Sequence, residues 1–298
     1  MKALIVINGY QVASGVTNQV SRLKEEFLKR DVEVDVKKNT DLYAYINNEN
    51  VIVNLPYYDL VVYLDKDRYI ARMLEKADYK LFNSVKAIEL CDDKMLTHIT
   101  LANNHIKMPI TLSSPLCFHD DGNRSFIKDV EKVLSYPLIV KENYGSLGKQ
   151  VYLISNHDEL VDISERLIHT NHLYQEFISS SKGKDYRLIV IGHKVIAYMK
   201  RENKHSYLSN LASGGTSSVV TLPDSYLKMA IDASNILDLD YCGVDILEGS
   251  NKEPILSEVN SNAFFEGIEK TTKINVAGAY VDYLINKVNS RKWEFSFW

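Results

Sequence analysis

The sequence predicts an α/β protein with three parts: an N-terminal parallel α/β domain, a central domain with a flap, and a mostly antiparallel α+β C-terminal domain. Three patterns predict this class. The chain opens with the order strand, helix, strand, a glycine-containing loop later separates two strands, and a strong hairpin pattern follows. We place the limits at residues 1–88, 89–174 and 175–290, with a tail at 291–298. A length of 298 residues agrees with several parts, since one core stops growing at about 250–300 residues.

The N-terminal domain is predicted from alternating patterns. Residues 2–8 form a short apolar run typical of a buried strand, and residues 58–64 form another. The valines at positions 32, 34 and 36 alternate with charged residues, as in a half-buried strand. An amphipathic helix lies between the first two strands, with apolar residues at Val16, Val20, Leu23 and Phe27. The loop at 8–15 lacks the three-glycine spacing of a dinucleotide-binding loop, so we predict an ordinary strand-to-helix turn there.

The central domain is predicted to open with a helix after Asp92. Its apolar face would carry Met95, Ile99, Ala102 and Ile106, and Pro109 would end it. Residues 136–142 and 151–154 read as strands, joined by the flap at 143–149.

The C-terminal domain is predicted from strands that pair with near neighbours. A strand at 173–178 comes first, and a hairpin at 187–191 and 195–201 turns at 192–194. Strands at 242–247 and 255–260 form a second pair. One helix has its apolar face at Tyr226, Ala230, Ala233 and Leu237, and the closing helix has its face at Ala277, Val281, Leu284 and Val288.

Composition excludes several classes of partner. Hydrophobic residues make up 45% and charged residues 25% of the chain, and 35 basic against 39 acidic residues give a net charge of −4. This balance gives no electrostatic footprint for nucleic acid or an anionic membrane. No run reaches the ~18 apolar residues of a membrane span, and the N-terminal apolar run is too short for a signal peptide. Cys91, Cys117 and Cys242 lack metal-ligand spacing, so we expect reduced thiols in a cytoplasmic protein.

Acidic and amide side chains on the last strand pair predict a metal site. Glu258 and Asn260 share one face because strand side chains alternate with period two. A loop centred near Asn251 would place Asp245 on that face too. Asp245 stands alone among apolar residues, and an unpaired buried carboxylate needs a cation. Oxygen ligands of this kind suit magnesium, although the solvated polar face of an edge hairpin is the alternative reading.

Lysines around the glycine loop predict a phosphate site. Lys141 ends an apolar strand directly before the flap, whose backbone N–H groups could wrap phosphates. Gly145 and Gly148 are weak signals alone, since two glycines can mark a plain turn. Lys94 opens a helix, where a cation is unfavourable against the helix dipole. An ordinary solvated lysine is the alternative at both positions.

The strand Leu173-Tyr174-Gln175-Glu176-Phe177-Ile178 would join the two larger blocks, where its backbone can meet an adenine edge. A plain core strand is the alternative. Asp185, Arg187 and Arg201 lie around the next hairpin, and the arginines could bind phosphate or a carboxylate with both donors. Surface arginines are the alternative there.

The order of these motifs resembles the ATP-grasp superfamily, and within it the RimK-type ligases of amino acids and peptides. The similarity spans residues 92 to about 285. It is carried by the phrases Tyr136-Pro137-Leu138-Ile139-Val140-Lys141, Ser209-Asn210-Leu211, Gly243-Val244-Asp245-Ile246-Leu247, Glu258-Val259-Asn260 and Glu266-Gly267-Ile268-Glu269-Lys270-Thr271-Thr272.

The resemblance implies a role for each matching residue. For ATP, it implies phosphate contacts by two lysines and the flap, adenine contacts by the crossing strand, and a ribose contact by Asp185. The cofactor-binding residues are Lys94, Lys141, Gly145, Ser146, Gly148, Gln175, Glu176, Phe177, Ile178, Asp185 and Arg187. Arg201 and Asn210 would face the transferred phosphoryl group. Asp245, Glu258 and Asn260 would bind two Mg²⁺ ions, with Mn²⁺ as an alternative metal.

The implied reaction is phosphorylation of a carboxylate by ATP, followed by attack of an amine to form an amide. No protein nucleophile is required, and the histidines are predicted as packing or surface residues. Where RimK-type sequences carry two arginines, this chain has Leu208 and Ser213. An altered acceptor site is therefore expected.

The acceptor would be a peptide, a carrier protein or a small-molecule acid, and glutamate is the first choice of amino acid. Cross-linking or macrocyclising a peptide is a second enzyme hypothesis. A nucleotide-binding module without ligase activity is the hypothesis of another class. The sequence leaves open the identities of the acid and amine, and whether the chain forms a homo-oligomer.

Overall fold

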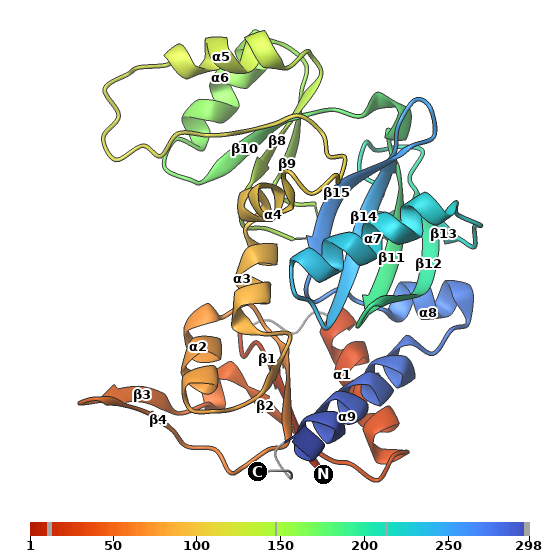
Figure 1. Cartoon of the computed structure of the whole chain (residues 1–298). Coiled ribbons are helices and arrows are strands. Elements are labelled where there is room, and N and C mark those ends of the chain that lie inside the picture. Colours follow the sequence, from red (N-terminus) through yellow and green to blue (C-terminus); the bar gives the residue numbers. More distant parts are fainter. Residues whose placement is uncertain (11–13, 147, 212–213, 295–298) are drawn as a thin grey trace.

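The computed structural model describes residues 1–10, 14–146, 148–211 and 214–294. Figure 1 shows three lobes: an N-terminal lobe in red and orange, a central lobe in yellow and green, and a C-terminal lobe in cyan and blue. This arrangement confirms the α/β class with parallel and antiparallel parts. Within the described residues, none of the helices combines the length and the apolarity needed to cross a membrane.

The N-terminal lobe is a parallel sheet with strand order β2-β1-β5-β6, which confirms the predicted strand–helix–strand opening. Its elements are β1 (Lys2–Ile7), α1 (Ser14–Leu28), β2 (Glu33–Lys38), β5 (Leu60–Leu64), α2 (Arg68–Lys76), β6 (Leu81–Phe82) and α3 (Val85–Asp92). A two-stranded hairpin that was not predicted, β3 (Ala44–Asn47) with β4 (Asn50–Val53), projects away from the lobe in Figure 1. The predicted turn at 8–15 includes residues 11–13, which lie outside the described residues.

The central lobe is an antiparallel sheet with strand order β7-β10-β8-β9. Its elements are β7 (Thr111–Ser113), α5 (Ser125–Val133), β8 (Leu138–Glu142), β9 (Val151–Ile154), α6 (His157–Arg166) and β10 (His172–Glu176). Leu138, Val140 and Tyr174 point to α5 and α6 in a core that belongs to this lobe alone. The predicted strand–flap–strand unit is confirmed, since β8 and β9 pair on either side of the flap.

The helix predicted after Asp92 is shorter than expected. It is α4 (Lys94–Leu101), and Asp93 caps it by accepting hydrogen bonds from the N–H groups of Met95 and Leu96. It ends well before Pro109, so the prediction that proline ends it was wrong. The predicted apolar face was wrong as well. Ile99 is exposed, whereas the buried residues are Thr97, His98 and Leu101.

The C-terminal lobe is an antiparallel sheet with strand order β13-β12-β11-β14-β15. Its elements are β11 (Lys184–Ile191), β12 (Lys194–Glu202), β13 (Thr216–Ser218), α7 (Asp224–Ile236), β14 (Tyr241–Glu248), β15 (Pro254–Asn260), α8 (Glu266–Thr272) and α9 (Val276–Glu294). Both predicted strand pairs and the apolar faces of α7 and α9 are confirmed. The helix α9 continues into the predicted tail, and residues 295–298 lie outside the described residues.

The first and last lobes share one hydrophobic core. Phe27 of α1, Val62 of β5, Ile189 of β11 and Val281 of α9 belong to the same buried cluster. Arg30 adds an ion pair to Asp282, and Figure 1 shows α1 beside α9. The limit predicted between residues 174 and 175 falls inside β10, which pairs with β8 of the central lobe. The limit after residue 88 falls inside α3.

Candidate active site

The C-terminal sheet carries a row of charged side chains on one face. Asp185 pairs in register with Arg201, Arg187 with Asp245, and Asp245 with Glu258. Residues in register across antiparallel strands project to the same side, so one row crosses β12, β11, β14 and β15. The register of Asp245 opposite Glu258 confirms the prediction that the two share a face.

Two arginines bind the buried aspartates of this row. Arg201 donates to Asp185 from Nε at 2.7 Å and from Nη2 at 2.5 Å, and its Nη2 lies 3.0 Å from Asp245 Oδ2. Arg187 donates to both carboxylate oxygens of Asp245, with Nη2 2.7 Å from Oδ2. Ser209 adds a hydrogen bond of 2.6 Å from its hydroxyl to Asp185. The guanidinium groups lower the pKa of Asp245 although burial raises it.

Asp245 is therefore not the lone carboxylate that its sequence neighbours indicated. Its cations are two arginines on adjacent strands, and both arginines are buried or nearly so rather than on the surface. A glycine gives them room, because a Cβ on Gly243 would stand 3.2 Å from Arg187 Cδ and 2.4 Å from Ala263 Cβ. The sequence showed each of these residues, but not their pairing across strands.

The edge strand β15 brings Glu258 to the start of α4. Glu258 Oε1 lies 3.8 Å from Lys94 Nζ, which also donates to the carbonyls of Asn143 at 3.4 Å and Gly145 at 3.2 Å. The same lysine thus contacts the metal-site candidate and the base of the flap. Asn260 Nδ2 is buried and has no hydrogen-bond partner among the described residues.

Lys141 points from β8 into the same space. It projects opposite to Val140, whose side chain is in the core of the central lobe. Burial is the main cause that lowers the pKa of Lys141 to about 8; Glu258 and Asp245 oppose this shift, and Lys94 adds to it. No carboxylate within the described residues forms an ion pair with its ammonium group, so this cation is removed from water without a paired counter-ion.

The flap of the central lobe reaches the C-terminal lobe beside this space. Gly148 has a φ of +75°, and a Cβ there would stand 2.9 Å from Asn210 Nδ2 and 3.1 Å from a methyl of Leu208. The amide N–H of Ser146 bonds Gln150 Oε1 at 3.3 Å. The flap thus lies close to Asn210, for which the resemblance implies a contact with the transferred phosphoryl group, whereas residue 147 and Ser213 lie outside the described residues.

Only part of the crossing strand, residues 173–178, is available to a ligand. Gln175 is buried and donates to Thr111 Oγ1 at 2.8 Å, so its side chain holds strands together. The N–H of Glu176 donates to the carbonyl of Ile110 at 2.8 Å and is occupied. Phe177 and Ile178 are half-buried, and the N–H of Ile178 bonds no described residue. The N–H of Phe177 bonds no described residue either, so both of these backbone donors are open to a ligand.

Two contributing residues were missed. His98 is buried beneath the cleft, 3.1 Å from Gln175 Nε2, and burial followed by the charge of Lys141 lowers its pKa to about 4. Its prediction as a packing residue holds, but its position behind Lys141 had no sequence signal. Ser209 was read as part of a motif, and only the fold shows that it orients Asp185.

The groups present fit the triphosphate of a nucleotide. Two lysines and the backbone of the flap lie around the space in which no described carboxylate forms an ion pair with Lys141. Two of the three predicted magnesium ligands fit this metal, and the third is occupied. Glu258 and the carboxamide of Asn260 present ligand atoms, whereas Asp245 already accepts from two guanidinium groups. No group of three or more acidic, histidine or cysteine ligands is assembled within the described part of the chain.

Two antiparallel sheets in separate lobes, with two lysines and a glycine flap gathered near Glu258 where the lobes meet, are the arrangement of an ATP-grasp protein. The model of the RimK-like ATP-grasp domain matches residues 91–284. The chain belongs to this family, which confirms the resemblance found in the sequence.

Named relatives agree with this assignment. The chain is 33% identical over 223 residues to β-citrylglutamate synthase B of Homo sapiens, covering 74% of this chain and 56% of that protein. It is 36% identical over 218 residues to a probable α-L-glutamate ligase of Maridesulfovibrio salexigens, covering 72% of this chain and 70% of that protein. The chain thus spans little more than half the length of the first relative.

Solved structures show the same fold. A RimK-domain ATP-grasp protein of Sphaerobacter thermophilus superposes with a TM-score of 0.71 at 17% identity, covering 96% of this chain and all of that one. The ATP-grasp ligase PsnB, in complex with a precursor variant, Mg and ADP, gives a TM-score of 0.66 at 18% identity, covering 95% and 97%.

Proposed function

We propose that this protein is an ATP-dependent carboxylate–amine ligase that forms an amide bond through an acyl phosphate. The carboxylate oxygen of one substrate attacks the γ-phosphorus of ATP, and the bond to the β-phosphate oxygen breaks to release ADP. The amine of the second substrate then attacks the acyl carbon. Phosphate leaves with the bonding electron pair, and the amine loses one proton to solvent or phosphate.

The observation that carries the proposal is the ammonium of Lys141, which has no ion-pair partner among the described residues and lies near Lys94 and the glycine flap. Together with Lys94, it would bind the phosphates of ATP, because a cation removed from water is most strongly attracted to a ligand that replaces its lost hydration. The free N–H of Ile178 would meet the adenine edge, with Phe177 packed nearby. Asp185 would hold the ribose only if its bonds to Arg201 and Ser209 give way.

Glu258 and Asn260 would hold magnesium, and Asp245 would join them once a guanidinium group moves aside. Bound magnesium supplies charge neutralisation at the phosphates. Arg201 lies at the end of the charged row nearest Ser209 and Asn210. From there its guanidinium would stabilise the charge that develops on the transferred phosphoryl group. Catalysis by positioning and charge needs no protein nucleophile.

Glutamate is the proposed amino-acid substrate, added to a peptide, a protein or a small acid. The names of both relatives contain glutamate, and the family match at residues 91–284 includes Lys94, Lys141 and Glu258. We further propose a cytoplasmic protein that binds two metal ions.

The test is release of ADP by the purified protein with Mg-ATP, L-glutamate and pools of carboxylic acids and short peptides. Release that requires both an acid and an amine is expected, and Glu258→Ala or Lys141→Ala is expected to abolish it with the fold intact. Lys149→Ala, an exposed lysine of the same loop, is the matched control and keeps its activity. Wild-type rates in both site variants would refute the site, and ATP binding without turnover in any mixture would favour a nucleotide-binding module.

A further inference from the structure

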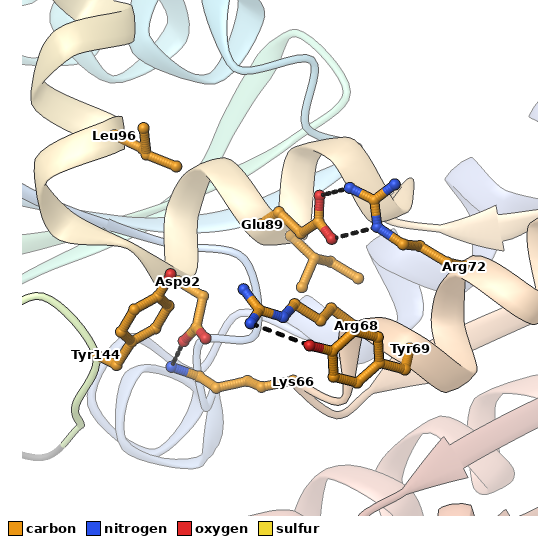
Figure 2. Close-up of a pocket in the computed structure, with 9 residues that line it drawn as sticks. Lys66, Arg68, Tyr69, Arg72, Glu89, Asp92, Leu96 and Tyr144 are labelled. Carbon is orange, nitrogen blue, oxygen red and sulfur yellow. Dashed lines mark hydrogen bonds and ion pairs between the residues drawn. The ribbon is translucent and has the colours of Figure 1, made fainter.

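A second pocket lies beside the flap, on the side of the N-terminal lobe. It has a volume of about 270 Å³. The start of α2, the outer face of α3, the first turns of α4 and Tyr144 of the flap form its walls (Figure 2). Pockets for drug-sized ligands measure roughly 300–1,000 Å³, so this one suits a group of amino-acid size.

Two of the cations in this pocket are already neutralised. Arg72 binds Glu89 with both donors, at 2.7 Å from Nε and 2.5 Å from Nη2. Lys66 forms an ion pair with Asp92. Both pairs appear as dashed lines in Figure 2. These contacts fix the walls and leave little attraction for a further anion.

The third cation, Arg68, lacks such a partner. It is exposed, and no carboxylate of the described residues forms an ion pair with it. Its Nη2 lies 3.5 Å from the hydroxyl of Tyr69, and its guanidinium carbon lies 5.2 Å from the centre of that ring. Figure 2 shows its guanidinium extending into the space flanked by the two ion pairs. The pocket therefore has one uncompensated positive charge on a planar group with several donors.

Tyr144 connects this charge to the flap. Its side chain lines the same pocket as Arg68, and burial raises the pKa of its hydroxyl. The carbonyls of the two neighbouring residues, Asn143 and Gly145, accept hydrogen bonds from Lys94. One face of the flap base thus borders the phosphate site and the other borders this pocket.

An amino acid that enters as the amine keeps its own carboxylates, which are not activated and need a cation. The two arginine positions of RimK-type sequences hold Leu208 and Ser213 here, and Leu208 places a methyl group against the flap at Gly148. We propose that Arg68, assisted by the hydroxyl of Tyr144, binds a carboxylate of the acidic amino-acid substrate in this pocket. This inference rests on the proposed ligase function for the identity of its ligand.

The test is calorimetric titration of L-glutamate into the full chain, with and without Mg²⁺ and a non-hydrolysable ATP analogue. A charge-assisted hydrogen bond predicts that Arg68→Ala weakens glutamate binding about 10- to 100-fold, with nucleotide binding unchanged. Arg68→Lys is expected to recover part of the affinity, because it keeps the charge and loses the planar fork. Arg166→Ala, which removes an exposed arginine 3.6 Å from Asp162 on α6, is the matched control.

The outcomes separate this inference from the proposed function. Equal glutamate affinities for the wild type and Arg68→Ala overturn the pocket assignment, and so does a wild type that binds no glutamate under either condition. A wild type that binds glutamate through Arg68 but binds no nucleotide supports the pocket and refutes the ligase. If Arg166→Ala weakens glutamate binding as much as Arg68→Ala does, the loss of affinity comes from the change in net charge alone. That result would overturn the assignment as well.

Discussion

Replacement of Lys141 by methionine is expected to stabilise the nucleotide-free protein while destroying its ability to bind ATP. Lys141 is a cation placed in a cleft without a described counter-ion, and burial lowers its pKa from 10.5 to about 8. That difference corresponds to about 3 kcal/mol of unfavourable free energy in the folded state at pH 7. Methionine keeps most of the side-chain volume and removes the charge, so the variant should regain a large part of this amount.

The effect has a defined pH window. Between about pH 8 and 10.5, the unfolded chain holds a proton on Lys141 that the folded chain has lost. The unfolded state then binds more protons, so wild-type stability rises with pH through this window. The variant lacks this gain. Its advantage is therefore full below about pH 8 and closes as the pH approaches 10.5.

Urea unfolding followed by circular dichroism, at several pH values from 7 to 10 and without nucleotide, measures the difference. Lys149→Met serves as the control, since it removes an exposed charge from the same flap and should leave stability unchanged. Added Mg-ATP should reverse the order, because a ligand that binds only the folded wild type stabilises it in proportion to its occupancy. A Lys141→Met protein less stable than the wild type at pH 7, or a gap independent of pH, would refute the reasoning.

Three further results are expected. ATP affinity should fall as the pH rises above about 8, because the free protein must regain the Lys141 proton to bind phosphate; flat calorimetric affinities from pH 7 to 9.5 would contradict this. Gly148→Ala should cost about 1 kcal/mol and raise the KM for ATP, since φ is +75° and the new methyl stands 2.9 Å from Asn210 Nδ2; an unchanged KM would show that the flap adapts freely. Arg201→Met should destabilise the fold by about 3–5 kcal/mol in urea unfolding, because Asp185 and Asp245 would lose a buried cation; a loss below 1 kcal/mol would mean that water replaces the guanidinium.

Periodic patterns predicted most of the framework, because a buried face imposes its period on the sequence. The pair β14 and β15 shows how far this extends, since the sequence predicted that Asp245 and Glu258 share a face, and the structure places them opposite each other. Counted from the loop, Ile246 pairs with Leu256, so an unbroken register would place Asp245 opposite Ser257. A bulge between the loop and the acids shifts the register and brings Glu258 opposite Asp245, and no pattern in the sequence revealed this bulge.

Predictions failed where a tertiary contact outweighed the local pattern. In α4 the apolar Ile99 faces solvent, while Thr97 and His98 are buried because the central sheet and α3 lie on their side. The hairpin of β3 and β4 escaped notice because it has almost no buried face to give it a period. Asp245 looked unpaired because its arginine partners are separated from it by dozens of residues in sequence. A local sequence pattern does not tell which strands are neighbours in the sheet.

The chain enters and leaves the central lobe at a single place. The N–H of Glu176 donates to the carbonyl of Ile110 at 2.8 Å, and the N–H of Ile110 donates to Glu176 Oε2 at 3.2 Å. Everything between these two residues has its own core, and the first and last lobes share theirs. The central lobe is therefore an inserted module on a two-stranded stem. To exchange this lobe for that of another ligase would therefore need only two cuts in the chain, at residues that a hydrogen bond already holds together.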